Sequence, residues 1–183
     1  MTRLHTPRWA WALTGSGHFF VESFELISTL EHCDVFVSKA ANEVLRMYKL
    51  KLDFPETTRV LHDKTASSVP VGGFYTGVYH TAVIAPATSN TVAKCVAGIS
   101  DSLPTNVYAQ AGKCLIPSIV FACDTAPELE TMAPSGMVKV YPRPIDLENT
   151  ARLKTYERTE VVESLADLVA AIKRRQNEID GDG

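Results

Sequence analysis

The sequence predicts an α/β fold in which helices cover both faces of a parallel sheet. Two observations lead to this prediction. Short apolar runs alternate with stretches in which apolar residues recur at helical spacing, an order typical of parallel strands joined by helices. The apolar runs also lack the period of two that marks a half-exposed strand. The expected architecture is therefore a doubly wound, Rossmann-like sheet.

The composition fits one compact unit. The chain has 183 residues, of which 45% are hydrophobic, so residues 1–183 are expected to form a single domain. The formal charge of -3 provides no general attraction for nucleic acid or an anionic membrane. The four cysteines lack the close spacing of a metal site and are expected to be free thiols. No apolar run approaches the roughly 18 residues of a spanning helix, so we expect a cytoplasmic protein without nucleic-acid or membrane partners.

The first fifty residues predict two strand–helix units. Residues 9–13 form an apolar run, residues 14–17 form a glycine turn, and residues 19–30 carry apolar side chains at helical spacing. The apolar run at residues 33–37 is followed at once by the helix-favouring stretch 40–50. The repetition of the unit supports a parallel sheet.

The middle of the chain contains one irregular segment and one clear strand. Prolines and glycines interrupt residues 51–77, which stay unassigned except for a short strand at residues 58–61. Residues 81–85 are apolar without alternation and predict a buried parallel strand that Pro86 ends. A helix at residues 90–98 then closes on a glycine.

The C-terminal third predicts two more strands and a final helix. Residues 115–122 are rich in β-branched side chains, and residues 137–141 form a shorter apolar run. Ser164 begins a capping box, and the apolar side chains of residues 165–172 make an amphipathic stripe. We expect this helix to pack against the sheet.

Ligands of such folds bind at the carboxyl ends of the strands, where helix N-termini offer free N–H groups. Gly15, Ser16 and Gly17 follow the first strand and predict either a phosphate-binding loop or a tight turn for strand–helix packing. A dinucleotide fingerprint needs a third glycine where this chain has Phe20, so a mononucleotide fits better. Ser38, after the second strand, fits a phosphate donor and a helix N-cap equally well.

A third loop at the same edge carries the most specific pattern. Residues 85–91 read Ala-Pro-Ala-Thr-Ser-Asn-Thr, and Ala93-Lys94, Gly98-Ile99 and Asp101 follow. This segment resembles the Pro-Ala-Ser-Ala-Asn-Thr loop, with its continuation, of the homo-oligomeric flavin-containing cysteine decarboxylase family. The glycine turn and Ser38 lie at the separations found in that family, so the resemblance extends over residues 9–123.

The resemblance implies an FMN site at the contacts of a trimer-based oligomer. It implies that the FMN phosphate lies near the glycine turn and Ser38, and that the isoalloxazine ring lies against the third loop. Asn90 is then in reach of flavin or substrate, and it also fits a helix N-cap. The cofactor-binding residues implied in this way are Gly15, Ser16, Gly17, Ser38, Ala85, Pro86, Ala87, Thr88, Ser89, Asn90 and Thr91.

The chain departs from the decarboxylases of that family at two places. Gly72 stands where they carry a catalytic histidine, and no Met-rich substrate clamp follows Cys114. The chain is therefore more similar to the redox branch, which includes archaeal-type flavoproteins and FMN-dependent dihydromethanopterin reductases. That branch implies electron transfer from NAD(P)H or another donor through FMN to a small acceptor, most specifically the pterin dihydromethanopterin. The alternatives are an FMN-dependent decarboxylase, a flavin prenyltransferase and a non-catalytic FMN-binding protein, and no catalytic residue is assigned.

The positions of four further side chains in the sequence indicate what roles to expect for them. His80 precedes the buried strand at the amino end of the sheet, far from the ligand edge, which predicts a structural role. His18 follows the glycine turn, where a helix-surface position and a place facing the phosphate both fit. Cys123 and Asp124 follow a strand at its carboxyl end, so we expect them to border the substrate pocket.

Overall fold

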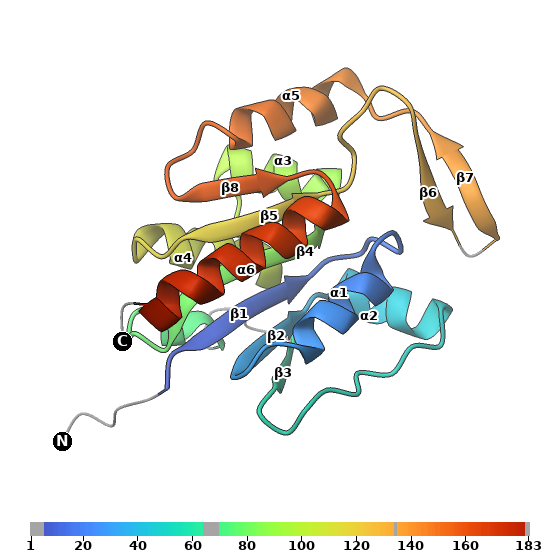
Figure 1. The fold of residues 1–183 in the computed structure, drawn as a ribbon. Coiled ribbons are helices and arrows are strands. Elements are labelled where there is room, and N and C mark those ends of the chain that lie inside the picture. The colour runs from blue at the N-terminus through green and yellow to red at the C-terminus, as the bar shows by residue number, and fades with distance from the viewer. Residues whose placement is uncertain (1–5, 64–69, 134, 182–183) are drawn as a thin grey trace.

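The computed structural model describes residues 6–63, 70–133 and 135–181, and a six-stranded sheet lies at its centre (Figure 1). In sheet order the strands are β3 (Arg59–His62), β2 (Cys33–Val37), β1 (Arg8–Leu13), β4 (Tyr79–Ala87), β5 (Ser118–Ala122) and β8 (Thr159–Val162). All neighbouring strands pair in parallel. The chain order reverses between β1 and β4, which makes this pair the switch point of a doubly wound sheet and confirms the predicted fold class.

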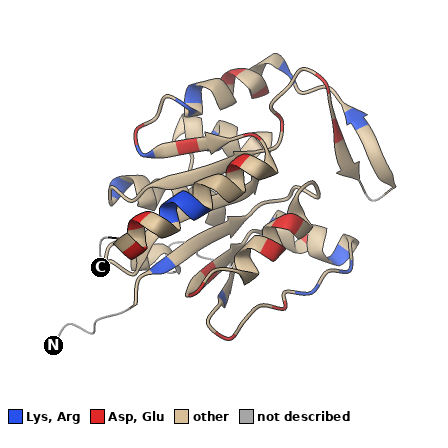
Figure 2. Cartoon of the chain, in the orientation of Figure 1, with Lys and Arg blue, Asp and Glu red and all other residues tan. Residues whose placement is uncertain are grey.

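Helices cover both faces of this sheet. The first face carries α1 (Phe20–Ser28), α2 (Lys39–Met47) and α6 (Leu165–Gly181); the second carries α3 (Ser89–Ala97), α4 (Leu103–Lys113), α5 (Pro144–Leu153) and the 3-10 helix η1 (Pro70–Phe74). Alternate strand residues enter two separate cores, so that Trp11 and Val83 belong to the first and Ala12 and Ile84 to the second. Charged side chains lie mostly on helices and loops, and the central strands are largely free of them (Figure 2).

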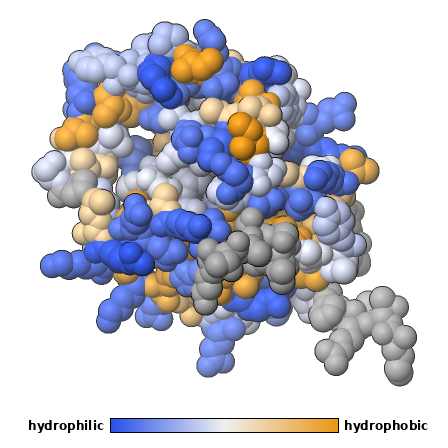
Figure 3. All heavy atoms as spheres, turned by 180° about the vertical axis from the view of Figure 1, so that it is seen from behind, coloured by the Kyte–Doolittle hydropathy of each residue, from blue (hydrophilic) through white to orange (hydrophobic). Residues whose placement is uncertain are grey.

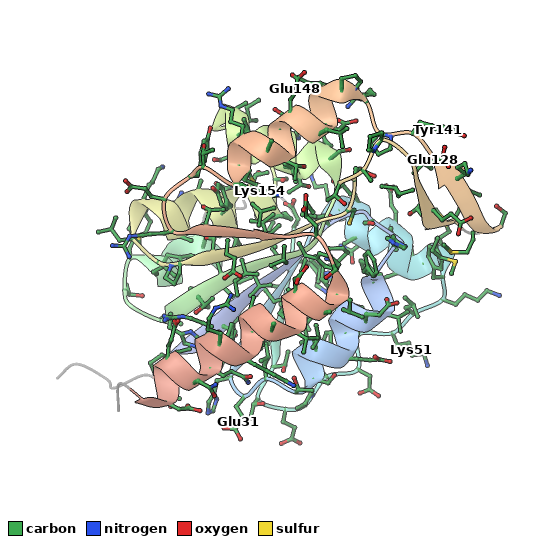
Figure 4. All side chains as sticks on the ribbon, turned by 45° about the horizontal axis from the view of Figure 1, so that its top comes forward. Glu31, Lys51, Glu128, Tyr141, Glu148 and Lys154 are labelled. Carbon is green, nitrogen blue, oxygen red and sulfur yellow. The ribbon has the colours of Figure 1, made fainter. Side chains whose placement is uncertain are left out.

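A hairpin projects from the body of the molecule beyond the carboxyl ends of the strands (Figure 1). It consists of β6 (Leu129–Ala133) and β7 (Gly136–Val140), which pair in antiparallel fashion apart from the main sheet. The strand predicted at residues 137–141 is thus β7, and the expectation that it joins the parallel sheet is wrong. Glu128 and Tyr141 flank the hairpin and lie at the outside of the molecule (Figure 4).

The strand predicted at residues 81–85 is longer than expected, because Pro86 does not end it. β4 runs to Ala87, and the peptide bond between Ala85 and Pro86 is cis. The pairing of β4 with β5 shifts register between Ile84 and Ala87. This irregularity lets a residue without a backbone N–H lie within a central strand.

The other predicted elements agree with the structure to within a few residues, and β3 confirms the short strand expected at residues 58–61. Within the irregular segment 51–77, residues 64–69 lie outside the described part of the chain. The elements η1, α4, β6, α5 and β8 are present without having been predicted. The helices α4 and α5 both have a proline in the first turn, where the missing N–H costs no helical hydrogen bond.

The amino ends of the central strands are tied together by a buried carboxylate. Asp34 in β2 is fully buried and accepts hydrogen bonds from Arg8 Nε at 2.7 Å and from the Tyr79 hydroxyl at 2.6 Å. Arg59 in β3 forms an ion pair with the same carboxylate. Burial, followed by the hydrogen bond to Asp34, raises the pKa of Tyr79 and keeps its hydroxyl protonated. Four strands thus share one polar centre.

His80 lies at this same amino end, as predicted. Its ring packs edge-on against Trp9 at a centroid distance of 4.9 Å, and Arg175 of α6 donates to its backbone carbonyl. Burial, with a smaller contribution from Arg175, lowers the pKa of His80 to about 4. The neutral imidazole is therefore a packing element at physiological pH.

The face opposite to the view of Figure 1 shows no strong segregation of apolar residues. Seen from behind, apolar residues form small separate groups among polar ones (Figure 3). Among the helices in the described part of the chain, none combines the length and the apolar character needed to cross a bilayer. All four cysteines are free thiols, as predicted.

Candidate functional site

An open cavity of about 420 Å³ lies at the switch point, beside the carboxyl ends of β1 and β4. Its volume falls in the range of small-molecule sites. Five of the predicted cofactor-binding residues line it, namely Gly15, Ser38, Thr88, Asn90 and Thr91. The structure therefore brings the glycine turn, the residue after β2 and the third loop to one place, although they are distant in the sequence.

The first wall of the cavity is the contact between the β1–α1 turn and the N-terminus of α2. A Cβ atom added at Gly15 would lie 2.6 Å from Ala40 Cβ, so only glycine allows this approach. Ser38 is the N-cap of α2, and its Oγ accepts from Ala41 N–H at 2.9 Å. The N–H groups of the first helical residues have no acceptor within the helix and give this wall a positive partial charge.

The opposite wall is the β4–α3 loop, which one threonine fastens to β1. Thr14 donates its hydroxyl to Pro86 O at 2.6 Å and accepts from Thr88 N–H at 3.2 Å. Thr88 is the N-cap of α3, and its Oγ1 accepts from Thr91 N–H. The expectation that Asn90 caps this helix is therefore wrong, because the helix begins one residue earlier and leaves Asn90 exposed in its first turn.

Three predicted residues act through the backbone alone. Ala85, Pro86 and Ala87 are buried inside β4 and do not line the cavity. Trp11 Nε1 donates to Ala85 O at 2.7 Å, and Cys123 N–H donates to Ala87 O at 3.1 Å. These contacts fix the end of β4 from both neighbouring strands.

Two predicted residues face away from the cavity, Ser16 toward the start of α1 and the end of β5, and Gly17 toward Tyr48 at the end of α2. Ser16 donates its hydroxyl to His18 O at 3.2 Å, and Cys123 Sγ lies 3.5 Å from Ser16 Oγ. Gly17 lies against the ring of Tyr48, whose hydroxyl a Cβ atom there would approach to 2.5 Å. The glycine turn therefore divides, with Gly15 on the cavity side and the next two residues on the other.

The loop after β5 completes the carboxyl edge. Asp124 Oδ2 accepts from Ser89 N–H at 3.4 Å, and Asp124 is half-buried. Burial raises the pKa of the neighbouring Cys123 thiol to about 12, so that it is neutral. These two residues lie at the carboxyl edge of the sheet but do not line the cavity, so the expectation that they border a substrate pocket stays a prediction. His18 also lies there, in the turn before α1 and not on the helix surface, and its pKa is lowered by burial.

The cavity also contains charged residues to which the sequence analysis assigned no role. Lys39 and Lys94 contribute cations, and Asp63 and Asp101 contribute carboxylates. Lys94 Nζ lies 2.8 Å and 2.9 Å from the two carboxylate oxygens of Asp101. The position of Lys39 directly after Ser38, at the start of a helix, is the sequence signal that would have found it.

A second cavity, of about 640 Å³, lies at the amino ends of β5 and β8. It is lined in part by Tyr108, whose hydroxyl is hydrogen-bonded to Thr159 Oγ1, and by Tyr156. None of the predicted site residues lines it. In the part of the chain that the structure describes, no group of three or more metal-ligating side chains is gathered.

Known proteins are similar to this chain over nearly its whole length. The crystal structure of DmrB from Burkholderia xenovorans in complex with FMN, described as a cubic protein cage for redox transfer, is 52% identical. The similarity covers 95% of this chain and 97% of that one, with a TM-score of 0.86. An FMN-dependent cysteine decarboxylase of thioviridamide biosynthesis, 20% identical with a TM-score of 0.64, covers 91% of this chain and 95% of its own, and shows the fold alone.

The dihydromethanopterin reductase (acceptor) of Methanosarcina mazei is 38% identical over 131 residues, which are 64% of this chain and 55% of the reductase. The chain thus matches about half the length of that enzyme. The model of the Flavoprotein family matches residues 1–179. The chain, with its doubly wound sheet and its cavity at the switch point, belongs to the Flavoprotein family.

Proposed function

We propose that the chain is an FMN-dependent reductase that passes electrons to a dihydropterin, most specifically dihydromethanopterin. The observation that carries the proposal is the cavity at the switch point, whose walls fit the phosphate end of FMN. It is supported by the FMN complex of the 52% identical relative and by the name of the Methanosarcina mazei reductase. We further propose that residues 1–183 act as one FMN-binding unit.

The phosphate end of FMN fits the wall formed by Gly15 and the N-terminus of α2. The Ser38 hydroxyl has its hydrogen left to donate, because its oxygen is the acceptor in the N-cap hydrogen bond. The first N–H groups of α2 and the Lys39 ammonium favour a dianion at this place. The lack of a Cβ at Gly15 keeps the backbone open to close approach.

The ring end of FMN fits the β4–α3 loop. The Thr14 and Thr88 contacts fix the loop, and Asn90 presents an exposed amide beside it. That amide can both donate and accept hydrogen bonds, as the edge of an isoalloxazine ring requires. Ser16 faces the start of α1 and the end of β5, and Gly17 lies against Tyr48 at the end of α2, so both would act by shaping the turn and not by touching the phosphate.

In this proposal the cofactor supplies the redox chemistry of the site. None of the described residues that line the cavity is a histidine or a cysteine, the side chains most often used for acid–base and covalent catalysis at neutral pH. Bound FMN supplies reversible two-electron chemistry, and reduction of a dihydropterin C=N bond consumes two electrons and two protons. The protein binds and orients the ring and excludes competing reactions.

Assembly, location and electron donor are parts of the same proposal. The DmrB relative is described as a cubic cage, and a homo-oligomer built from trimers is compatible with that symmetry. We propose NAD(P)H as donor and the cytoplasm as location. The mass of the purified protein by light scattering, expected to be a multiple of three chains, checks the assembly.

The test of this function uses the full-length protein under anaerobic conditions. We expect stoichiometric binding of FMN by equilibrium dialysis and bleaching of the flavin absorbance on addition of NADPH, NADH or dithionite. Addition of dihydromethanopterin should then restore the oxidised absorbance with one turnover per flavin. A protein that refuses FMN contradicts the whole proposal. Flavin that is reduced but never reoxidised by the pterin contradicts the reductase function and leaves a non-catalytic flavin carrier.

A further inference from the structure

The carboxylate of Asp124 has a position that the FMN site itself does not explain. Asp124 follows β5, and the sheet order places β5 next to β4 on the side away from β2. Along the carboxyl edge of the sheet the order is therefore Ser38 after β2, then the β4–α3 loop, then Asp124 after β5. If the phosphate lies at the first of these places, Asp124 lies at the end where the ring reacts.

This carboxylate is held in place but is not neutralised. The N–H of the preceding residue, Cys123, donates to Ala87 O at 3.1 Å and fixes the backbone, and Ser89 N–H lies at 3.4 Å from Oδ2. In the described part of the chain no ion pair includes Asp124. The guanidinium of Arg143, a cation in its vicinity, forms two hydrogen bonds to the Asp146 carboxylate.

The carboxylate oxygens of Asp124 can therefore accept more hydrogen bonds than the neighbouring protein groups donate. A carboxylate has two oxygens with about four lone-pair positions, and among the described residues Asp124 accepts one long hydrogen bond, from Ser89 N–H. Burial lowers the pKa of the nearby His18 imidazole, and the carboxylates of Glu22 and, to a smaller extent, Asp124 oppose this shift without cancelling it. A half-buried anion at a ligand edge is best stabilised by a ligand that brings N–H donors.

We propose that Asp124 recognises the 2-amino-4-oxo edge of the dihydropterin. That edge presents two parallel N–H donors, N3–H and the 2-amino group, at the spacing of the two oxygens of a carboxylate, the same bidentate geometry that joins arginine to carboxylates. The inference rests on the proposed pterin reductase function and adds the residue that determines its specificity. Asp124 binds the pyrimidine end, so that the reducible C=N bond lies over the flavin ring.

The experiment compares two substrates in two proteins. The probes are 6-methyl-7,8-dihydropterin and its 2,4-dioxo analogue, 6-methyl-7,8-dihydrolumazine, which replaces the donor amino group by an acceptor. We expect the wild-type protein to prefer the dihydropterin. Asp124→Asn replaces one acceptor by a donor and should lower kcat/KM for the dihydropterin by about tenfold or more, mainly through KM. The same variant should lose or reverse the preference between the two probes.

Controls separate a specificity role from a structural one. Asp124→Asn should bind FMN and be reduced by dithionite as the wild type is, and Glu128→Gln, which removes a carboxylate from an exposed pair with Lys139, should keep the wild-type preference. An unchanged preference in Asp124→Asn overturns the inference while the reductase function stands. A loss of FMN binding in that variant also overturns it, since Asp124 would then support the flavin site. A wild-type protein that reduces neither probe nor dihydromethanopterin contradicts the proposed function itself.

Discussion

Ser38 shows that a helix N-cap can remain available to a ligand. Its oxygen accepts the Ala41 N–H as an N-cap, as the sequence predicted for a serine before a helix. Its hydroxyl hydrogen is still available for a phosphate at the same helix end. Local hydrogen bonding and ligand binding therefore do not compete at this residue, and capping alone cannot argue against a functional role.

The sequence was sufficient to predict which loops form the candidate site, but not which way each of their side chains points. The loops that line the cavity follow strands, and their edge was predictable because parallel strands end on one side. The orientation of Ser16 was not predictable, since it depends on where β5 and Cys123 lie. The burial of Ala87 likewise follows from the extension of β4 beyond residue 85, which Pro86 concealed in the sequence.

Gly15 gives the sharpest test at the scale of one residue. Gly15→Ala would put a Cβ 2.6 Å from Ala40 Cβ and force the β1–α1 turn away from α2. We expect a loss of roughly 1–3 kcal/mol in the free energy of unfolding, as for overpacking, and weaker FMN binding. Chemical denaturation and equilibrium dialysis measure the two effects.

Gly112→Ala is the matched control, because nothing lies within 4 Å of a Cβ added there. Gly112 belongs to α4, where alanine is favoured by up to about 1 kcal/mol. This variant should be at least as stable as the wild type. Equal stability and equal FMN affinity for Gly15→Ala and wild type would contradict the role assigned to the turn.

At the scale of elements, the buried strands were the easiest to predict. β1, β2, β4 and β5 consist of almost continuous apolar runs, because both faces of each strand are covered. β8 reads Thr-Glu-Val-Val and lies at the sheet edge, where half of its residues need not be apolar. The helices α4 and α5 contain many polar residues, so their apolar spacing was weak, and the proline in the first turn of each also fits a loop.

The β6–β7 hairpin is expected to contribute little to stability. The fully buried hydrophobic residues of the described chain lie outside it, and Met132, Met137 and Val138 are exposed apolar residues. It touches the body through Tyr48 and His18, each at 3.4 Å from a backbone atom of Met132. Replacing residues 129–140 with a short Gly-Ser linker should lower the free energy of unfolding by no more than about 1 kcal/mol.

Circular dichroism and urea denaturation check this expectation. Because the hairpin stands at the carboxyl edge, the same deletion should change turnover or assembly more than it changes stability. A deleted protein that unfolds at a much lower urea concentration would show that the hairpin is part of the cooperative core.

At the scale of the whole molecule, the candidate site and the buried Asp34 centre lie at opposite edges of the sheet. The carboxyl edge carries the cavity, whereas the amino edge carries the buried Asp34 centre that joins β1, β2, β3 and β4. A substitution at the amino edge should therefore act on folding and leave the FMN affinity of the folded protein nearly unchanged.

Asp34→Asn tests this separation. The variant leaves the partly buried Arg8 without its counter-charge, and removing one partner of a buried ion pair costs roughly 3 kcal/mol or more. Glu160→Gln, which breaks the exposed pair with Arg174, should cost less than about 1 kcal/mol. Denaturation midpoints rank the two variants, and equilibrium dialysis on folded protein gives the FMN affinity. A large loss of FMN affinity in folded Asp34→Asn would contradict the division between the two edges.

The hydrogen bond from Trp11 to Ala85 O places a tryptophan where its fluorescence can report FMN binding. It holds the fully buried indole of Trp11 at the carboxyl end of β4, against which the flavin ring is proposed to lie. Indole emission overlaps the near-ultraviolet absorption of flavins, so a filled site quenches it by resonance energy transfer. The chain has two tryptophans, both in β1. Its intrinsic emission therefore reports the occupancy of the site in every variant, without an added dye.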